Sequence, residues 1–186
     1  MQNIEEKLVT QCKNGDISAL EKLFYILKDN VYSIAFRILG NEQDAEDITQ
    51  EVFIKIWLNL TGFNMKSSIR TWVYKIAVNL CYDLQKKRNN LIEEPIEDFD
   101  AFHSDEEPFI LLTKKELEEK VEKFFLMLSL DSRLVLTLKE LEGLSYNEIA
   151  DILGCTINSA KMKGYRARVE FKKIVMKYLR DGKDEL

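Results

Sequence analysis

The stretch LSYNEIADILGCTINSAKMKGYRAR, residues 144–168, predicts two short helices joined by a tight turn. Ser145 can cap the first helix, and the carboxylate of Glu148, three residues later, can reach back to complete a capping box. Gly154 can adopt the left-handed conformation that ends a helix without a Cβ penalty. The segment between Ser145 and Gly154 is therefore expected to be a short helix with a defined start and end.

A second, basic helix is predicted directly after this turn. Thr156 or Asn158 can cap it. Its exposed positions carry the cations Lys161, Lys163, Arg166 and Arg168. A helix, a glycine turn and a basic helix outline a helix-turn-helix, which places its second helix in the major groove of DNA. The alternative is an ordinary helical hairpin with a solvated basic face.

Composition favours a helical protein with packed cores. Of the 186 residues, 46% are hydrophobic and 10% aromatic, which suffices for one or two folded domains. Only 2 prolines and 7 glycines occur. We expect an all-α fold with a helical domain over residues 1–90, a flexible acidic linker over 91–113 and a helix-turn-helix domain over 114–186.

The cellular setting follows from the cysteines and the N-terminus. Cys12, Cys81 and Cys155 stand far apart, which indicates neither a zinc site nor a disulfide framework. The N-terminal MQNIEEKLV lacks the basic and apolar regions of a signal peptide, and no apolar run reaches the length of a membrane span. These features favour a cytoplasmic protein without membrane insertion.

Charge is distributed unevenly along the chain. The net charge is −5, but residues 91–113 alone carry −8 and no Lys or Arg. Residues 55–88 carry +6, and residues 158–180 carry +7. Because local patches decide binding more than the total charge does, the two basic segments are candidates for nucleic-acid contact.

The N-terminal part is predicted to be a series of helices. The first covers residues 3–13 and closes at the Asn14-Gly15 turn. Asp16 can cap a second helix, and a separate third apolar series leads to a stop at Gly40. The second helix carries Leu20, Leu23, Phe24 and Leu27 at helical spacing, and the third series is Val31, Ile34, Ala35 and Ile38. Asn41 then caps an acidic helix over residues 42–60, whose apolar set should face the core: Ala45, Ile48, Val52 and Ile56.

The acidic helix carries its polar side chains largely opposite this apolar set. They are Asp44, Asp47, Gln50, Glu51 and Lys55, with Phe53 and Trp57 near the margin. From spacing alone, a solvated face is the favoured interpretation. Metal ligation by Asp44 and Asp47 is a minor alternative.

The basic stretch TGFNMKSSIRTWVYKIAVNLCYDLQKKR, residues 61–88, predicts a loop followed by a helix. Ser67 or Ser68 can cap that helix, which should run from about residue 69 to 87. Aromatic residues alternate there with cations, a pattern that suits single-stranded nucleic acid because rings stack on bases and cations contact phosphates. For Trp72, a place in a core stripe with Ile76 and Leu80 is an equal alternative.

No catalytic constellation is found in the sequence. His103 is the only histidine and falls in the predicted linker, which argues against a histidine-based triad. The chain has no phosphate-binding glycine loop and no HExxH motif. We therefore expect a protein without enzymatic activity or a cofactor.

Three motifs in this order resemble a bacterial RNA polymerase sigma factor of the extracytoplasmic-function (ECF) group of the sigma-70 family. DAEDITQEVFIKIW is similar to the part of region 2 that docks on core polymerase. FNMKSSIRTWVYKIAVNLCYDLQKKR is similar to the segment that melts the promoter and reads the −10 element as a single strand. GLSYNEIADILGCTINSAKMKGYRAR is similar to the region 4 helix-turn-helix that reads the −35 duplex.

The resemblance implies roles for specific residues. Contacts to core polymerase are implied for Asp44, Asp47, Gln50, Glu51, Phe53 and Trp57, which replaces the interpretation of a merely solvated face. Contacts to the −10 single strand are implied for Phe63, Asn64, Lys66, Ser67, Ser68, Arg70, Trp72, Tyr74, Lys75, Asn79 and Arg88. Contacts to the −35 duplex are implied for Ser145, Tyr146, Thr156, Asn158, Ser159, Lys161, Lys163, Arg166 and Arg168.

The resemblance also implies partners: the clamp helices and flap of core RNA polymerase, promoter DNA, and an anti-sigma factor as a candidate inhibitor. Two features depart from the family pattern, namely residues 158–162 at the entry to the basic helix and Gly164 at a position that is usually apolar. The implied function is promoter recognition and transcription initiation. A stand-alone helix-turn-helix regulator is the main alternative, and a helical adaptor that binds proteins through the acidic helix is another.

Overall fold

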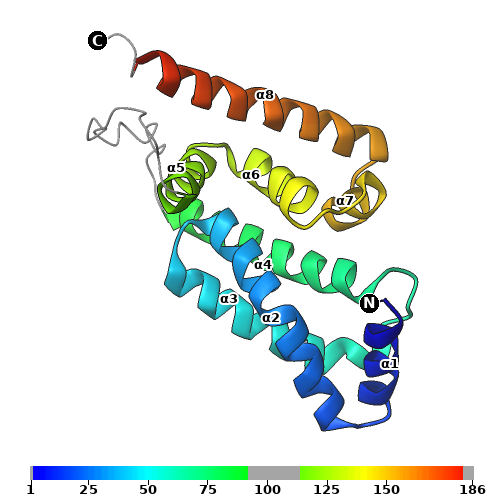
Figure 1. Cartoon of the computed structure of the whole chain (residues 1–186). Helices are drawn as coiled ribbons and strands as arrows, with labels where there is room; N and C mark the ends of the chain where they lie inside the picture. Colours follow the sequence, from blue (N-terminus) through cyan, green and yellow to red (C-terminus); the bar gives the residue numbers. More distant parts are fainter. Residues whose placement is uncertain (1, 92–113, 182–186) are drawn as a thin grey trace.

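The computed structural model describes residues 2–91 and 114–181, and this part of the chain is helical throughout, without strands (Figure 1). The N-terminal half consists of α1 (Gln2–Lys13), α2 (Ile17–Leu39), α3 (Glu42–Asn59), a 3₁₀ turn η1 (Leu60–Gly62) and α4 (Ile69–Leu91). The C-terminal half consists of α5 (Lys114–Leu126), α6 (Leu130–Leu136), a π-helical turn η2 (Thr137–Leu141), α7 (Tyr146–Leu153) and α8 (Ile157–Asp181). The expected all-α class is confirmed.

The predicted helix caps of the N-terminal half are present. One carboxylate oxygen of Asp16 accepts hydrogen bonds from the backbone N–H groups of Ser18 and Ala19 at 2.9 and 3.2 Å. Gly40 ends α2 with a φ of 70°, and the side chain of Asn41 caps α3. Residues 17–39 form one continuous helix, so the apolar series on either side of residue 30 belong to a single α2.

The contacts among α2, α3 and α4 form the core of the N-terminal half. Along α2, the side chains of Leu23, Leu27, Val31, Ile34 and Ile38 are buried. On α3, the predicted inward set, Ala45, Ile48, Val52 and Ile56, is buried as expected. This core fixes the rotation of α3 about its axis, and the acidic side of that helix consequently faces solvent.

The C-terminal half is built around the helix-turn-helix. Its buried residues include Leu134 and Leu138 before the motif, and Ile149 and Ile152 on α7. Ala160 and Ala167 are fully buried on the inner face of α8. Small side chains there let α8 pack closely, and the opposite side of α8 is left at the surface.

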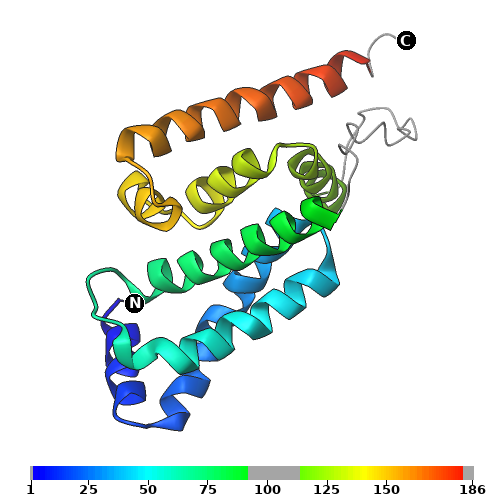
Figure 2. The same ribbon diagram turned by 180° about the vertical axis from the view of Figure 1, so that it is seen from behind.

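The two halves are in contact in this structure. α4 packs on α2 and α3 within the N-terminal half and on α7 of the C-terminal half, and α2 contacts α6 (Figures 1 and 2). Buried residues of both halves form one continuous apolar cluster. The predicted linker, for residues 92–113, lies outside the described residues, as does His103. Within the described ranges, no helix combines the length and apolar character needed to cross a membrane.

Candidate nucleic-acid interface

The geometry of the helix-turn-helix follows the local chemistry of residues 144–168. The backbone N–H of Ser145 donates to a carboxylate oxygen of Glu148 at 2.8 Å, and the Ser145 hydroxyl oxygen accepts from the backbone N–H of Glu148 at 3.3 Å. Gly154 has a φ of 60°, as its predicted role in ending α7 requires. Thr156 Oγ1 accepts from the backbone N–H of Ser159 at 3.1 Å, which identifies Thr156 as the cap of α8.

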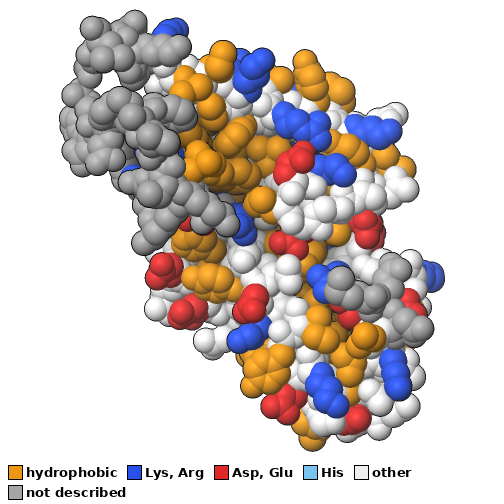
Figure 3. Space-filling view, viewed as in Figure 1, with side chains coloured by type: hydrophobic (Ala, Val, Ile, Leu, Met, Phe, Trp, Pro, Cys, Tyr) orange, Lys and Arg blue, Asp and Glu red, His pale blue; other side chains and the backbone are white. Residues whose placement is uncertain are grey.

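The four predicted cations of α8 lie in two different electrostatic settings. Lys161 and Arg166 are exposed and form no ion pair among the described residues. Lys163 pairs with Asp131 of α6, and this hydrogen bond holds the pKa of the Asp131 carboxyl below its usual value. Arg168 pairs with Glu140 at 3.0 Å. Lys and Arg side chains spread along the α8 side of the molecule (Figure 3).

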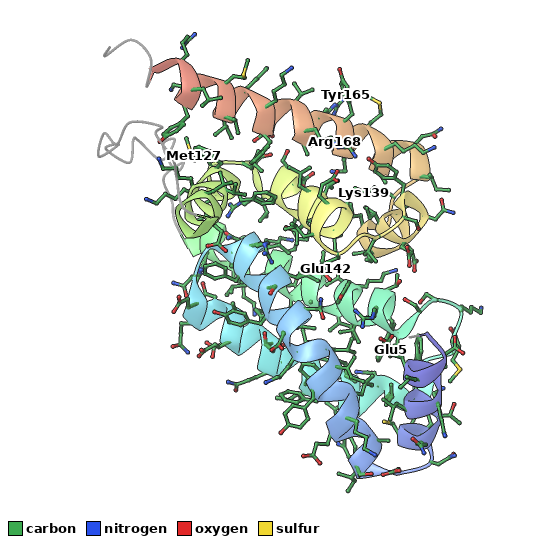
Figure 4. All side chains as sticks on the ribbon, viewed as in Figure 1. Glu5, Met127, Lys139, Glu142, Tyr165 and Arg168 are labelled. Carbon is green, nitrogen blue, oxygen red and sulfur yellow. The ribbon has the colours of Figure 1, made fainter. Side chains whose placement is uncertain are left out.

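Two apolar residues of α8 accompany these cations and were not predicted as site residues. Met162 is 51% exposed and Tyr165 is 61% exposed. Tyr165 projects from the side of α8 that faces away from α4 (Figure 4). Apolar side chains on a recognition helix can contact the methyl group of thymine. Both residues directly neighbour a cation in the predicted basic helix, and this sequence pattern could have identified them as site residues.

The unusual glycine of α8 has a packing reason. A Cβ on Gly164 would lie 2.7 Å from the hydroxyl oxygen of Tyr146, so the glycine makes room for that ring. The Tyr146 hydroxyl in turn accepts a hydrogen bond from Arg168 at 3.0 Å, and Lys139 lies over the ring at 5.1 Å from its centroid. Tyr146 therefore positions Arg168 instead of projecting freely toward DNA.

The loop before α4 presents a partly open surface. Asn64 and Lys66 are exposed. Phe63 is buried and packs on Trp72, with ring centroids 5.0 Å apart, and Lys13 donates to the backbone carbonyl of Phe63. Trp72 is half-buried, so it has a packing role and also keeps part of its ring at the surface. Of the two predicted caps of α4, Ser68 accepts from the backbone N–H of Thr71 at 3.0 Å.

Two arginines predicted to contact single-stranded DNA are held by carboxylates. Arg88 forms a bidentate pair with Asp44, with both N–O distances at 2.6 Å, and the Asp44 carboxylate is largely buried. Arg70 pairs with the buried Glu5 of α1 at 2.8 Å. Because Asp44 is engaged with Arg88, it does not stand on the open acidic face of α3.

Further along α4, the predicted residues face the C-terminal half. Tyr74 is only 1% exposed, and its hydroxyl donates to Glu142 at 2.7 Å. Burial and this hydrogen bond raise the pKa of Tyr74 above its ordinary value. Lys75 pairs with Asp151 of α7 at 3.3 Å. Asn79 is exposed at the edge of a small cavity between the halves.

The outer face of α3 is open to a protein partner. Asp47, Gln50 and Glu51 are exposed, and acidic side chains gather over the N-terminal end of this helix (Figure 3). Trp57 is 52% exposed, whereas Phe53 is half-buried and packs on Phe24. Two further apolar side chains, Ile54 and Leu58, are exposed on α3 but were not predicted as site residues. Within the described ranges, no group of three or more metal-binding side chains is assembled.

A helix-turn-helix with an exposed basic helix, joined to a bundle with an exposed acidic and apolar helix, defines a DNA-binding protein that also has a surface suited to a protein partner. Comparison with known families gives its class. Residues 23–90 match Sigma-70 region 2, and residues 118–171 match Sigma-70, region 4.

Relatives along nearly the whole chain agree with these matches. The RNA polymerase sigma-H factor of Pseudomonas aeruginosa is 30% identical over 190 residues, covering 97% of this chain and 98% of the relative. The ECF RNA polymerase sigma factor SigW of Bacillus subtilis is 30% identical, and the alignment covers 93% of this chain and 97% of SigW. The ECF RNA polymerase sigma-E factor of Escherichia coli is 31% identical, with coverages of 88% and 90%.

Solved structures share the fold. CnrH, in complex with the cytosolic domain of CnrY, superposes with a TM-score of 0.70 at 22% identity, covering 92% of this chain and 97% of CnrH. RpoE of Bartonella quintana, in complex with the anti-sigma factor NepR, gives 0.69 at 24% identity, with coverages of 86% and 98%.

The chain belongs to the sigma-70 family of RNA polymerase sigma factors, in its ECF group. It is a DNA-binding protein of transcription initiation, and this assignment is favoured over a stand-alone helix-turn-helix regulator. The family is not a family of enzymes.

Proposed function

We propose that this sigma factor docks on the clamp helices of core RNA polymerase through the outer face of α3. The observation that carries the proposal is the exposure on one helix of charged or polar groups beside large apolar ones. Large apolar side chains at the surface mark interaction sites, and aromatic residues supply much of the energy of protein interfaces. The docking residues are Asp47, Gln50, Glu51, Ile54, Trp57 and Leu58, with Phe53 supporting them from below.

The C-terminal half contributes the −35 contact in this proposal. Lys161 and Arg166 reach DNA directly because they are exposed and form no ion pair among the residues described. Lys163 and Arg168 also contact DNA, after they leave their carboxylate partners Asp131 and Glu140 and bind phosphates or bases instead. Asn158, Ser159 and the cap residue Thr156 lie at the N-terminal end of α8, which is the part of a recognition helix that contacts base edges. Ser145 and Tyr146 support the motif, and the flap of core polymerase is its expected protein neighbour.

The −10 contact is assigned to the loop before α4 and to α4 itself. The accessible part of this −10 site consists of the exposed Asn64 and Lys66, Ser67 and the half-buried Trp72. A melted strand needs aromatic rings for stacking and cations for phosphates, and each stacked base is worth roughly 1–3 kcal/mol. The chemistry of RNA synthesis belongs to the polymerase, and this chain supplies positioning and strand capture.

The test is run-off transcription with purified core polymerase on the DNA upstream of this protein's own gene. We expect initiation that depends on the protein and is lost in a Gln50→Ala/Glu51→Ala variant. A Glu21→Ala variant, which changes an exposed residue of α2, should behave as wild type. If the protein neither supports initiation nor binds core polymerase in a pull-down, the proposal is wrong.

We further propose an anti-sigma protein as a partner, since RpoE of B. quintana forms a complex with the anti-sigma factor NepR. Co-purification of a protein that blocks run-off transcription when added back would support this proposal. Full transcriptional activity of the sigma factor in extracts made under all tested growth conditions would count against it.

A further inference from the structure

The helix α1 lies beside the loop that precedes α4, and two of its side chains hold the two ends of that loop (Figures 1 and 2). We call residues 63–70 the −10 loop. At its start, the ammonium group of Lys13 donates a hydrogen bond to the backbone carbonyl of Phe63. At its end, Nε of Arg70 donates to a carboxylate oxygen of Glu5 at 2.8 Å. Glu5 lies on α1 beside the start of α4 (Figure 4).

Both contacts involve groups that are withdrawn from solvent. Glu5 is only 5% exposed, and Arg70 compensates the charge of its carboxylate. Phe63 is buried, and its ring centroid lies 5.0 Å from that of Trp72 and 6.0 Å from Lys13 Nζ. Removing one partner of a buried pair leaves the other uncompensated, so these contacts tie the loop to α1 more firmly than surface ion pairs would.

The place of Arg70 in the chain is not explained by the stability of α4 alone. Arg70 is the second residue of α4. A cation in the first turn of a helix opposes the macrodipole, which favours negative charge there. The compensating carboxylate of Glu5 comes from another helix. The pair therefore joins α1 to the end of the −10 loop.

The spacing of the two anchors keeps the loop arched. Glu5 and Lys13 are eight residues apart, which corresponds to about 12 Å along a helix. The chain from Phe63 to Arg70 could extend over about 24 Å, which is twice that length. The middle of the loop therefore projects away from α1.

The projecting part contains a residue with a strained backbone. Met65 has a φ of 58° and is 44% exposed. A residue with a Cβ persists in this left-handed conformation only where the surrounding structure imposes it. Asn64 Oδ1 accepts a hydrogen bond from the backbone N–H of Lys66 at 3.1 Å and so closes a turn around Met65. The turn and the two anchors together impose the shape in which Asn64 and Lys66 are exposed.

We propose that α1 positions the −10 loop for strand capture, with Glu5 and Lys13 as the positioning residues. The inference rests on the proposed function of this loop. It gives a role to a helix that precedes the match to Sigma-70 region 2, which begins at residue 23. It also makes Arg70 a positioning residue, in place of the DNA contact that the family resemblance implies.

A loop without its anchors samples other shapes, and only molecules with the competent shape bind the strand. Apparent affinity falls by the competent fraction, so a loop that is competent in about 10% of molecules binds about tenfold more weakly. Affinity for the −35 duplex should not change, because its proposed site is on α8. Affinity for core polymerase should not change either, because the proposed docking face is on α3.

The first experiment uses holoenzyme assembled from core polymerase and the full-length protein. Lys13→Met removes the ammonium group and keeps an apolar stem, whereas Lys13→Arg restores a donor. Lys7→Met is the matched control, because Lys7 is an exposed cation of the same helix. Fluorescence anisotropy measures binding to the non-template strand upstream of the run-off start, and separately to the upstream duplex. Circular dichroism and thermal unfolding show that each variant is folded.

A charge exchange tests the other anchor. Glu5→Arg and Arg70→Glu each bring like charges together, and the double variant restores an opposite pair. A positioning role predicts that both single variants lose strand affinity and that the double variant recovers it. If the double variant stays as weak as Arg70→Glu, then Arg70 contacts DNA directly and the positioning role of Glu5 is overturned.

The order of the loop can be measured separately through Trp72, which packs on Phe63. In a Trp57→Phe background, Trp72 is the only tryptophan of the chain. We expect acrylamide to quench its fluorescence more strongly when Lys13→Met is added to the free protein. Adding Lys7→Met should leave the quenching unchanged.

We expect Lys13→Met to bind the single strand about tenfold more weakly, with Lys13→Arg and Lys7→Met close to wild type. An equal loss of duplex affinity in Lys13→Met would indicate a general defect and overturn the positioning role. If Lys13→Met binds the strand as wild type while Lys66→Ala binds it more weakly, the role of α1 is wrong and the proposed −10 site stands. Wild-type strand affinity in both Lys66→Ala and Trp72→Ala contradicts the proposed function of the loop, and the role of α1 with it.

Discussion

Gly164 of α8 and Tyr146 of α7 are in such close contact that a Cβ on the glycine would lie 2.7 Å from the tyrosine hydroxyl. An exposed helical glycine replaced by alanine would gain about 1 kcal/mol of helix stability. At residue 164 the opposite is expected, because overpacking costs typically about 1–3 kcal/mol. We expect Gly164→Ala to lower the thermal unfolding temperature and to weaken duplex binding, since Tyr146 holds Arg168.

The control for this prediction is Gly62→Ala in η1, where nothing lies within 4 Å of the added Cβ. That change should leave the unfolding temperature nearly unaltered. Adding Tyr146→Leu to Gly164→Ala should recover stability by removing the clash. A Gly164→Ala protein as stable as wild type would show that the Tyr146 ring moves aside without cost.

The Asp44–Arg88 pair predicts different effects for two acids on the same helix. Asp44→Asn removes the largely buried carboxylate that accepts two hydrogen bonds from the exposed Arg88, and a hydrogen bond to a charged group contributes about 1.5–3 kcal/mol. We expect denaturant unfolding to show a loss of that size. Asp47→Asn is the comparison, because Asp47 is exposed and only accepts a 3.4 Å hydrogen bond from Gln43. It should change stability by less than about 0.5 kcal/mol. Equal stability losses in both variants would show that the Asp44–Arg88 pair contributes nothing specific to stability.

Apolar residues of α3 should matter for binding but not for folding. Trp57 and Leu58 are 52% and 68% exposed, so Trp57→Ala or Leu58→Ser should leave the unfolding temperature almost unchanged. Each should weaken binding to core polymerase, since truncation of an aromatic anchor at an interface typically costs about 2 kcal/mol or more. Tyr25→Ala is the matched control, because Tyr25 is 59% exposed on α2. Pull-down titrations with core polymerase measure the effect, and wild-type affinity of the Trp57 variant would exclude it as an anchor.

The salt dependence of duplex-DNA affinity should show which cations of α8 contact phosphates. Each neutralised phosphate contributes about −0.9 to the slope of log affinity against log salt for duplex DNA, so four contacts give a slope near −3.6. Lys161→Ala and Arg166→Ala should each reduce the slope by about 0.9. Substituting Lys123, an exposed cation of α5, should not alter it. Titrations of a promoter duplex at several salt concentrations test this, and an affinity independent of salt would contradict the phosphate contacts.

Tyr74 and Tyr82 predict the alkaline behaviour of the boundary between the halves. Burial and hydrogen bonds to Glu142 and Asp131 raise both pKa values above the ordinary 10.0. Because the pKa values are higher in the folded than in the unfolded state, the stability they contribute is present below about pH 10 and is lost as the pH rises beyond it. We expect tyrosinate absorbance to develop late for Tyr74 and Tyr82, and also for Tyr32, whose pKa is raised by burial and by Glu42 and Glu46. Tyr82→Phe should remove one late component, and normal titration of Tyr74 and Tyr82 would show that the boundary is open in solution.

Local signals predicted much of the fold because their physical causes lie within a few residues. Asp16 caps α2 through backbone N–H groups two and three residues away, and Ser145 and Glu148 form the capping box within one turn. Helical spacing likewise identified the buried side of α3. The order of the three motifs was enough to indicate the family, and family matches and relatives confirm it.

The partners of individual site residues could not be predicted in this way. Arg70 pairs with Glu5 across 65 residues, and Arg88 pairs with Asp44 across 44. A single sequence contains no signal for such pairings, because any exposed cation can pair with any nearby acid once the chain has folded. The exposed Ile54 and Leu58 were likewise missed, since spacing alone does not distinguish the margin of a core from an open surface.

The helix caps and the helix-turn-helix could be predicted from the amino-acid sequence because they depend on short-range backbone and side-chain chemistry, and the order of the motifs was enough to indicate the class of protein. The burial of Tyr74 against Glu142, 68 residues away, and the need for Gly164 beside Tyr146 became visible only in the folded chain. The burial of a side chain depends on which helices pack against one another. That packing depends on the sum of many contacts between residues that are far apart in the sequence.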